Sequence, residues 1–173
     1  MIKKYIFLNL IFTAMIFAQE CVIDYRLMYT IASNERHHKK PIGYPYLISF
    51  NKPSQKKVLP ANIRSLMLDG RTIDCKNSNT CVQILTYLSQ NGVKNLDLGA
   101  FQINYMYHGK KASLASFFNL KESYDIARDL AEIHVKKHGC TWKSLARYHS
   151  ATQKYNQRYT NNLKKNYMRS YNE

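Results

Sequence analysis

Acidic residues are scarce in this chain. Its 173 residues include only 11 Asp and Glu against 26 Lys and Arg, which gives a formal net charge of +15. A length of this size favours one domain. So large a positive charge indicates an anionic partner. Nucleic acid, a carboxylate-bearing cell wall and a membrane surface all satisfy this condition, and charge alone does not choose among them.

Long apolar runs are also lacking, except at the start of the chain. Residues 5–18 are almost entirely apolar, and Lys3 and Lys4 precede them. This run is too short to span a bilayer comfortably, so we interpret residues 1–18 as a secretory signal peptide cleaved after Ala18. The alternative is an uncleaved membrane anchor. Export places the mature protein in the periplasm or outside the cell.

Cysteine is the next scarce residue. There are four, namely Cys21, Cys75, Cys81 and Cys140, and all follow the signal peptide. An even number of cysteines in an exported chain favours disulfides over a metal site or a catalytic thiol. Four cysteines allow three pairings. We favour Cys75–Cys81, which are close in sequence, together with Cys21–Cys140, which would tie the first helix to a late loop.

The hydrophobic pattern predicts a mostly helical α+β fold with a small antiparallel sheet. The expected helices cover residues 22–35, 78–90, 123–138 and 142–149, and a last helix follows Thr152. A strand is expected over 44–50 and a loop over 51–61. A hairpin with arms 65–68 and 71–74 is expected to turn at Asp69-Gly70. Ser78 or Thr80 is expected to cap the second helix. The apolar stripe of the long helix is expected to include Ile133.

Three short segments could carry chemistry. Glu35 follows an apolar helix, and the negative end of a helix favours a protonated carboxyl. Residues 97–104 (DLGAFQIN) form a glycine-containing turn that leads into two side-chain amides, which can both donate and accept hydrogen bonds. Residues 148–150 (YHS) place an aromatic hydroxyl near the end of a helical run.

In this order, the three segments resemble the active-site motifs of the lytic transglycosylases of the SLT family, which have a lysozyme-like fold. The resemblance covers residues 22–162 and is closest to small single-domain members, some of which serve secretion or conjugation machines. It implies a transglycosylase domain over residues 19–162, followed by a basic tail rich in Tyr and Asn over 163–173. It also implies a monomer in the bacterial cell envelope that acts on peptidoglycan glycan strands and needs no cofactor and no metal.

The resemblance makes Glu35 the catalytic residue. Glu35 would protonate the bond between N-acetylmuramic acid and N-acetylglucosamine, and would then act as a base on the C6 hydroxyl to close a 1,6-anhydro ring. This chemistry needs no second carboxylate, in contrast to most glycosidases. The alternative is a hydrolytic lysozyme in which Asp97 is the second carboxylate.

The other motif residues would bind substrate. Gly99 would let the backbone pass close to the sugar, while Gln102 and Asn104 would bind N-acetyl groups and hydroxyls. Tyr148 would orient the acid and the substrate. Ser150 is a weaker candidate of the same kind.

The chain departs from the family pattern at Ala100-Phe101, where the family usually has Leu-Met, in an apparent insertion over residues 51–63, and directly after Glu35. Arg36 stands where the family usually has serine after the catalytic glutamate. It could interact with Glu35, or it could point outward and bind a peptide carboxylate of the wall. This departure and the high charge motivate a second hypothesis, a non-catalytic wall-binding or assembly protein on the same fold.

Three further patterns favour ordinary structural roles. His134 and His138 lie four residues apart near Cys140, but this spacing is more typical of an exposed helix face than of a metal site. His149 is expected to be structural or exposed. The interleaved tyrosines and cations after Thr152 resemble a stacking surface for single-stranded nucleic acid. We favour a packed terminal helix there, and export argues against nucleic acid as a partner outside a DNA-transfer machine.

Overall fold

The computed structural model describes residues 22–169. The elements are α1 (Tyr25–Glu35), β1 (Leu47–Phe50), η1 (Pro53–Val58), α2 (Ala61–Arg64), β2 (Thr72–Asp74), α3 (Ser78–Gln90), β3 (Leu96–Leu98), β4 (Ile103–Asn104), α4 (Tyr105–His108), η2 (Leu114–Phe118), α5 (Leu120–His138), α6 (Trp142–Leu145), η3 (Ala146–Tyr148) and α7 (Gln153–Arg169). The predicted α+β fold, mostly helical with a small antiparallel sheet, is confirmed.

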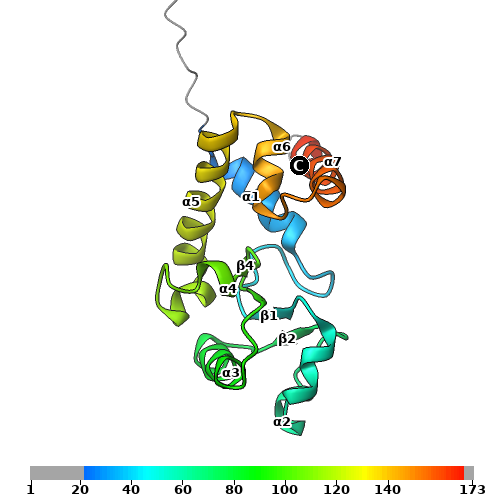
Figure 1. Cartoon of the computed structure of the whole chain (residues 1–173), viewed down its shortest axis with the longest axis vertical. Helices are drawn as coiled ribbons and strands as arrows, with labels where there is room; N and C mark the ends of the chain where they lie inside the picture. The colour runs from blue at the N-terminus through cyan, green and yellow to red at the C-terminus, as the bar shows by residue number, and fades with distance from the viewer. Residues whose placement is uncertain (1–21, 170–173) are drawn as a thin grey trace, which may run out of the picture.

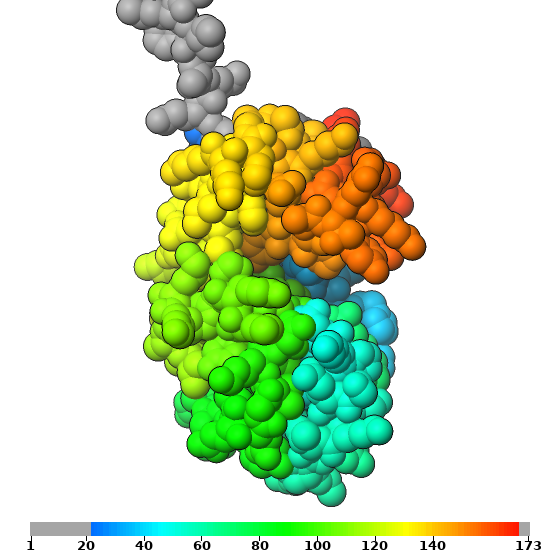
Figure 2. Space-filling model, in the orientation of Figure 1, coloured from blue at the N-terminus to red at the C-terminus, as the bar shows by residue number. Residues whose placement is uncertain are grey.

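The elements gather in two parts (Figure 1). At the top of the view, α1, α5, α6 and α7 pack against one another. At the bottom lies a four-stranded sheet in the order β2-β1-β3-β4, antiparallel at every pairing and covered by α3. The space-filling view shows the surface set back between the two parts, where the blue segment around α1 comes into sight (Figure 2).

Local signals explain most of the helix ends. The Asp24 carboxylate accepts a hydrogen bond from the Leu27 amide and caps α1. The cap of α3 is Asn77, so the expected cap at Ser78 or Thr80 is wrong. Helix α5 begins at Leu120, and the expected core position Ile133 is 48% exposed, because the stripe that faces the core runs through other residues: Ser123, Ala127, Leu130, Ala131 and Val135.

The sheet differs from the predicted one, because strands β3 and β4 were not expected and one expected strand is missing among the described residues. The 65–68 arm of the expected hairpin is not a regular strand; Met67 makes a single bridge with Ile73, and the Leu68 amide donates to the Thr72 carbonyl at 2.8 Å. The expected loop over 51–61 contains the short helix η1. In both segments the backbone follows short turns, and such turns are too short to produce a hydrophobic periodicity in the sequence.

One predicted disulfide lies in the sheet part of the molecule. The predicted Cys75–Cys81 disulfide is confirmed and joins the end of β2 to α3, with Cα atoms 5.0 Å apart. The second expected disulfide, Cys21–Cys140, includes a residue outside the described range. The expected signal peptide also lies outside that range. Between residues 22 and 169, no helix is both long and apolar enough to cross a membrane.

The last helix belongs to the folded domain. The boundary expected after residue 162 falls inside α7, whose later residues remain packed: Leu163 is fully buried, and the Tyr167 ring lies 5.2 Å from the Trp142 ring. Because α7 packs against α1, it also lies beside the segment that ends at Glu35.

Candidate active site

Helix α1 ends at Glu35. Met28 and Ile31 on the apolar face of the helix are buried, and the helix stops at Glu35 because the backbone becomes extended at Arg36. The Glu35 side chain is 11% exposed. Its Oε1 atom is buried and makes no hydrogen bond to another described residue. Helix α1 thus ends in a carboxyl group that is largely shielded from solvent.

The third motif reaches this carboxyl through His149. The imidazole Nδ1 of His149 lies 3.5 Å from Glu35 Oε1, and the ring stacks on Tyr159 at a centroid distance of 4.6 Å with parallel planes. The interaction with Glu35 raises the pKa of His149. Burial, together with the nearby Glu35, raises the pKa of the Tyr159 hydroxyl well above its usual value. His149 is therefore a neighbour of the candidate acid, which the sequence did not predict.

Tyr148 joins the third motif to the second. Its hydroxyl donates to the Phe101 carbonyl at 2.7 Å. Burial raises the pKa of this hydroxyl well above its usual value, and the negative charges of Glu35 and Asp97 act in the same direction. Tyr148 therefore ties the 97–104 segment to the third motif.

The glycine turn is built for packing. Gly99 has φ +71°, and an added Cβ would lie far inside van der Waals contact of the Phe117 carbonyl oxygen. Gln102 also has positive φ, at +47°, and its Nε2 donates to the Gly99 carbonyl at 2.8 Å. These contacts give Gly99 a structural requirement of its own, separate from the close approach to sugar that the sequence suggested.

Asp97 and Asn104 face each other across the β3–β4 pair. The Asn104 Nδ2 donates to Asp97 Oδ1 and to Asn95 Oδ1, both at 2.9 Å. The other carboxylate oxygen of Asp97 lies 3.7 Å from the Arg71 guanidinium. Burial raises the pKa of Asp97, with the charge of Glu35 acting in the same sense. Both oxygens of Asp97 thus have protein partners.

Ser150 and Arg36 complete the set of predicted binding residues. The Ser150 hydroxyl accepts from the Thr152 amide at 3.1 Å, and its carbonyl accepts from the Asn156 side chain at 3.0 Å, so Ser150 shapes the turn into α7. Arg36 is exposed, and within residues 22–169 it forms no ion pair with Glu35. Of the two alternatives for Arg36, the outward orientation is the one observed.

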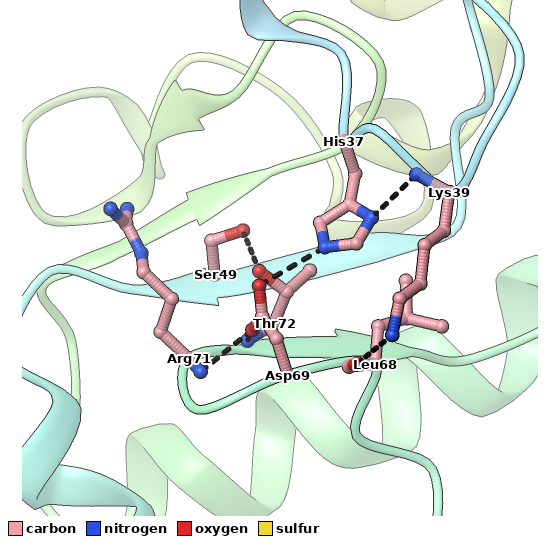
Figure 3. A network of polar contacts seen from close by, with 7 residues as sticks. All are labelled: His37, Lys39, Ser49, Leu68, Asp69, Arg71 and Thr72. Carbon is pink, nitrogen blue, oxygen red and sulfur yellow. Dashed lines mark hydrogen bonds and ion pairs between the residues drawn. The ribbon is translucent and has the colours of Figure 1, made fainter.

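The chain that leaves Glu35 is anchored to the sheet (Figure 3). The His37 ring contacts Asp69 Oδ2 at 3.1 Å, and Lys39 Nζ donates to the Leu68 carbonyl at 2.8 Å. The other oxygen of Asp69 accepts from the amides of Arg71 and Thr72. Burial alone would raise the pKa of Asp69, but these hydrogen bonds outweigh it and lower the pKa to about 2. This network holds the position at which α1 ends.

No metal centre accompanies these residues. In the described part of the chain, no group of three or more His, Cys, Asp or Glu side chains could hold a metal ion. His134 and His138 stack with centroids 6.4 Å apart on α5.

Comparisons with protein-family models, curated proteins and solved structures each return no match. A proposal for function therefore rests on the chemistry of the residues around Glu35.

Proposed function

We propose that this protein is an exported peptidoglycan lytic transglycosylase with Glu35 as its catalytic residue. The observation that carries this proposal is the convergence of the three sequence motifs. Glu35 lies 3.5 Å from His149 in the third motif, and the adjacent Tyr148 donates to Phe101 in the second. Segments far apart in sequence are thus brought to one shielded carboxyl group.

The proposed reaction uses one carboxyl group twice. Glu35 donates its proton to the oxygen that links N-acetylmuramic acid to N-acetylglucosamine, and that bond breaks. The muramyl N-acetyl group stabilises the positive charge that develops. The Glu35 carboxylate then removes the proton from the C6 hydroxyl, whose oxygen bonds to the same carbon. The proton lost in the first step is recovered in the second, and no water is consumed.

The surroundings of Asp97 favour this mechanism over ordinary hydrolysis. A second catalytic carboxylate must have an oxygen free to attack the sugar or to activate water. Both oxygens of Asp97 have protein partners, one on Asn104 and one near Arg71. Asp97 is better placed to hold β3 and β4 together.

The direct test is mass spectrometry of fragments released from purified peptidoglycan. The protein should release muropeptides one water lighter than hydrolysis products, and Glu35→Gln should release none while it keeps its circular dichroism spectrum and its binding to the glycan. Fragments that carry the extra water would indicate a hydrolase and return attention to Asp97. Binding without release by the unaltered protein, or full activity of the Gln variant, would overturn the proposal.

A further inference from the structure

Helix α7 carries a line of cations on its outer face. With 3.6 residues per turn, Lys154, Arg158, Lys165 and Arg169 fall within about 60° of one another around the helix axis. All four side chains are exposed. They lie opposite the buried face, which contains Asn156, Tyr159, Thr160 and Leu163. At a rise of about 1.5 Å per residue, the line extends for about 22 Å.

Within residues 22–169, no acidic side chain forms an ion pair with this line. The sequence contains no Asp or Glu from residue 133 to residue 172. Like charges in a row repel one another unless an anionic partner lies over them.

One residue of the line, Arg158, is adjacent in sequence to a residue that packs in the candidate active site. Arg158 precedes Tyr159, whose ring stacks on His149 next to Glu35. Its charge reaches that imidazole, because it opposes the rise in the pKa of His149 that Glu35 produces. A strand bound at Glu35 could therefore continue over the outer face of α7.

We propose that the α7 cation line, Lys154, Arg158, Lys165 and Arg169, binds carboxylates on the peptide stems of a peptidoglycan strand held at Glu35. This inference rests on the proposed function and adds the peptide stems to the part of the substrate that the protein recognises. Stems attached along a glycan repeat their negative charges along its length, which suits cations arranged in a line.

The same helix is less suited to other anionic partners. Single-stranded nucleic acid needs exposed rings on which bases stack. Of the tyrosines in α7, Tyr159 is buried and Tyr167 packs against Trp142, which leaves Tyr155 at 51% exposure. A helix that binds a membrane inserts an apolar face, but the least polar face of α7 is already packed in the fold.

The test compares two triple variants in a Glu35→Gln background, where the polymer stays intact. Lys154→Gln, Lys165→Gln and Arg169→Gln remove most of the line and spare Arg158, which neighbours the site. The matched control variant replaces three exposed lysines elsewhere by Gln, namely Lys52, Lys57 and Lys94. Binding is measured by sedimentation with intact peptidoglycan, with glycan strands stripped of their stems by an amidase, and with a single-stranded oligonucleotide.

The line variant should bind intact peptidoglycan about tenfold more weakly, because three charge contacts of modest strength are lost. It should bind stripped strands as the parent does, and the control should lose less than about twofold. Equal losses in the two triples, or equal losses on intact and stripped polymer, would refute the inference. Selective loss of oligonucleotide binding would assign the line to nucleic acid instead. Cleavage by the unaltered chain is scored separately, so failure of the proposed reaction would not be mistaken for failure of this surface.

Discussion

Gly99→Ala separates a packing role of this glycine from a role in substrate binding. Gly99 has φ +71°, and an added methyl group would collide with the Phe117 carbonyl. Gly92 has nearly the same backbone, with φ +76°, but a Cβ there would meet no atom within 4 Å. Gly92→Ala is therefore a matched control that keeps the backbone strain and removes the collision.

The two substitutions should differ in their effect on the free energy of unfolding. A left-handed backbone costs an L-residue about 1–2 kcal/mol, which both variants incur. Overpacking adds about 1–3 kcal/mol, which only Gly99→Ala incurs, since a backbone carbonyl cannot swing aside as a flexible side chain can. We expect Gly92→Ala to lose about 1–2 kcal/mol and Gly99→Ala about 2–5 kcal/mol.

Urea unfolding followed by circular dichroism measures both losses, and fragment release from peptidoglycan measures activity below the unfolding transition. Equal destabilisation of the two variants would refute the packing argument. A Gly99→Ala protein as stable as the Gly92→Ala protein, yet inactive, would instead support the close approach of substrate that the sequence suggested.

Two further predictions concern pH. Glu35 raises the pKa of His149, whose Nδ1 lies 3.5 Å from Glu35 Oε1, so the His149 ring should titrate at a lower pH in Glu35→Gln than in the parent when its NMR signals are followed. An unchanged His149 titration in that variant would contradict this pairing. Burial alone would raise the pKa of Asp74, but hydrogen bonds from neighbouring lysines and a tyrosine lower it from 3.8 to about 2. The stabilising contribution of ionised Asp74 should be complete above about pH 5 and disappear as the pH falls through 2. The urea midpoints of the parent and Asp74→Asn should therefore converge in acid. A difference between the two midpoints that stays constant from pH 5 to pH 2 would be inconsistent with the lowered pKa.

The sequence predicts the helices well because their signals are local. The end of α1 at Glu35 follows from the polar run after it, and the end of α5 follows from Gly139, which has φ +82°. The Cys75–Cys81 pair was also predictable, since a short loop joins its partners. In each case the information lies within a few residues of the feature.

The neighbours of Glu35 could not be found in this way. His149 and Tyr159 stack because η3 and α7 meet beside the end of α1, more than a hundred residues away in sequence. No spacing rule links a glutamate at 35 to rings at 149 and 159. The packing role of Gly99 is hidden for the same reason, because its neighbour Phe117 comes from another element.

These long-range contacts bear on one departure from the motif pattern that this chain resembles. Arg36 stands where the resemblance implies a serine after the candidate acid, and it is exposed and makes no ion pair with Glu35 within the described residues. The polar group beside Glu35 comes instead from His149, on whose ring Tyr159 stacks. Tyr159 lies on α7, and so does the cation line. If the proposed function holds, α7 both encloses the acid and extends the substrate surface, so a basic C-terminal segment that first suggests a tail is part of the site.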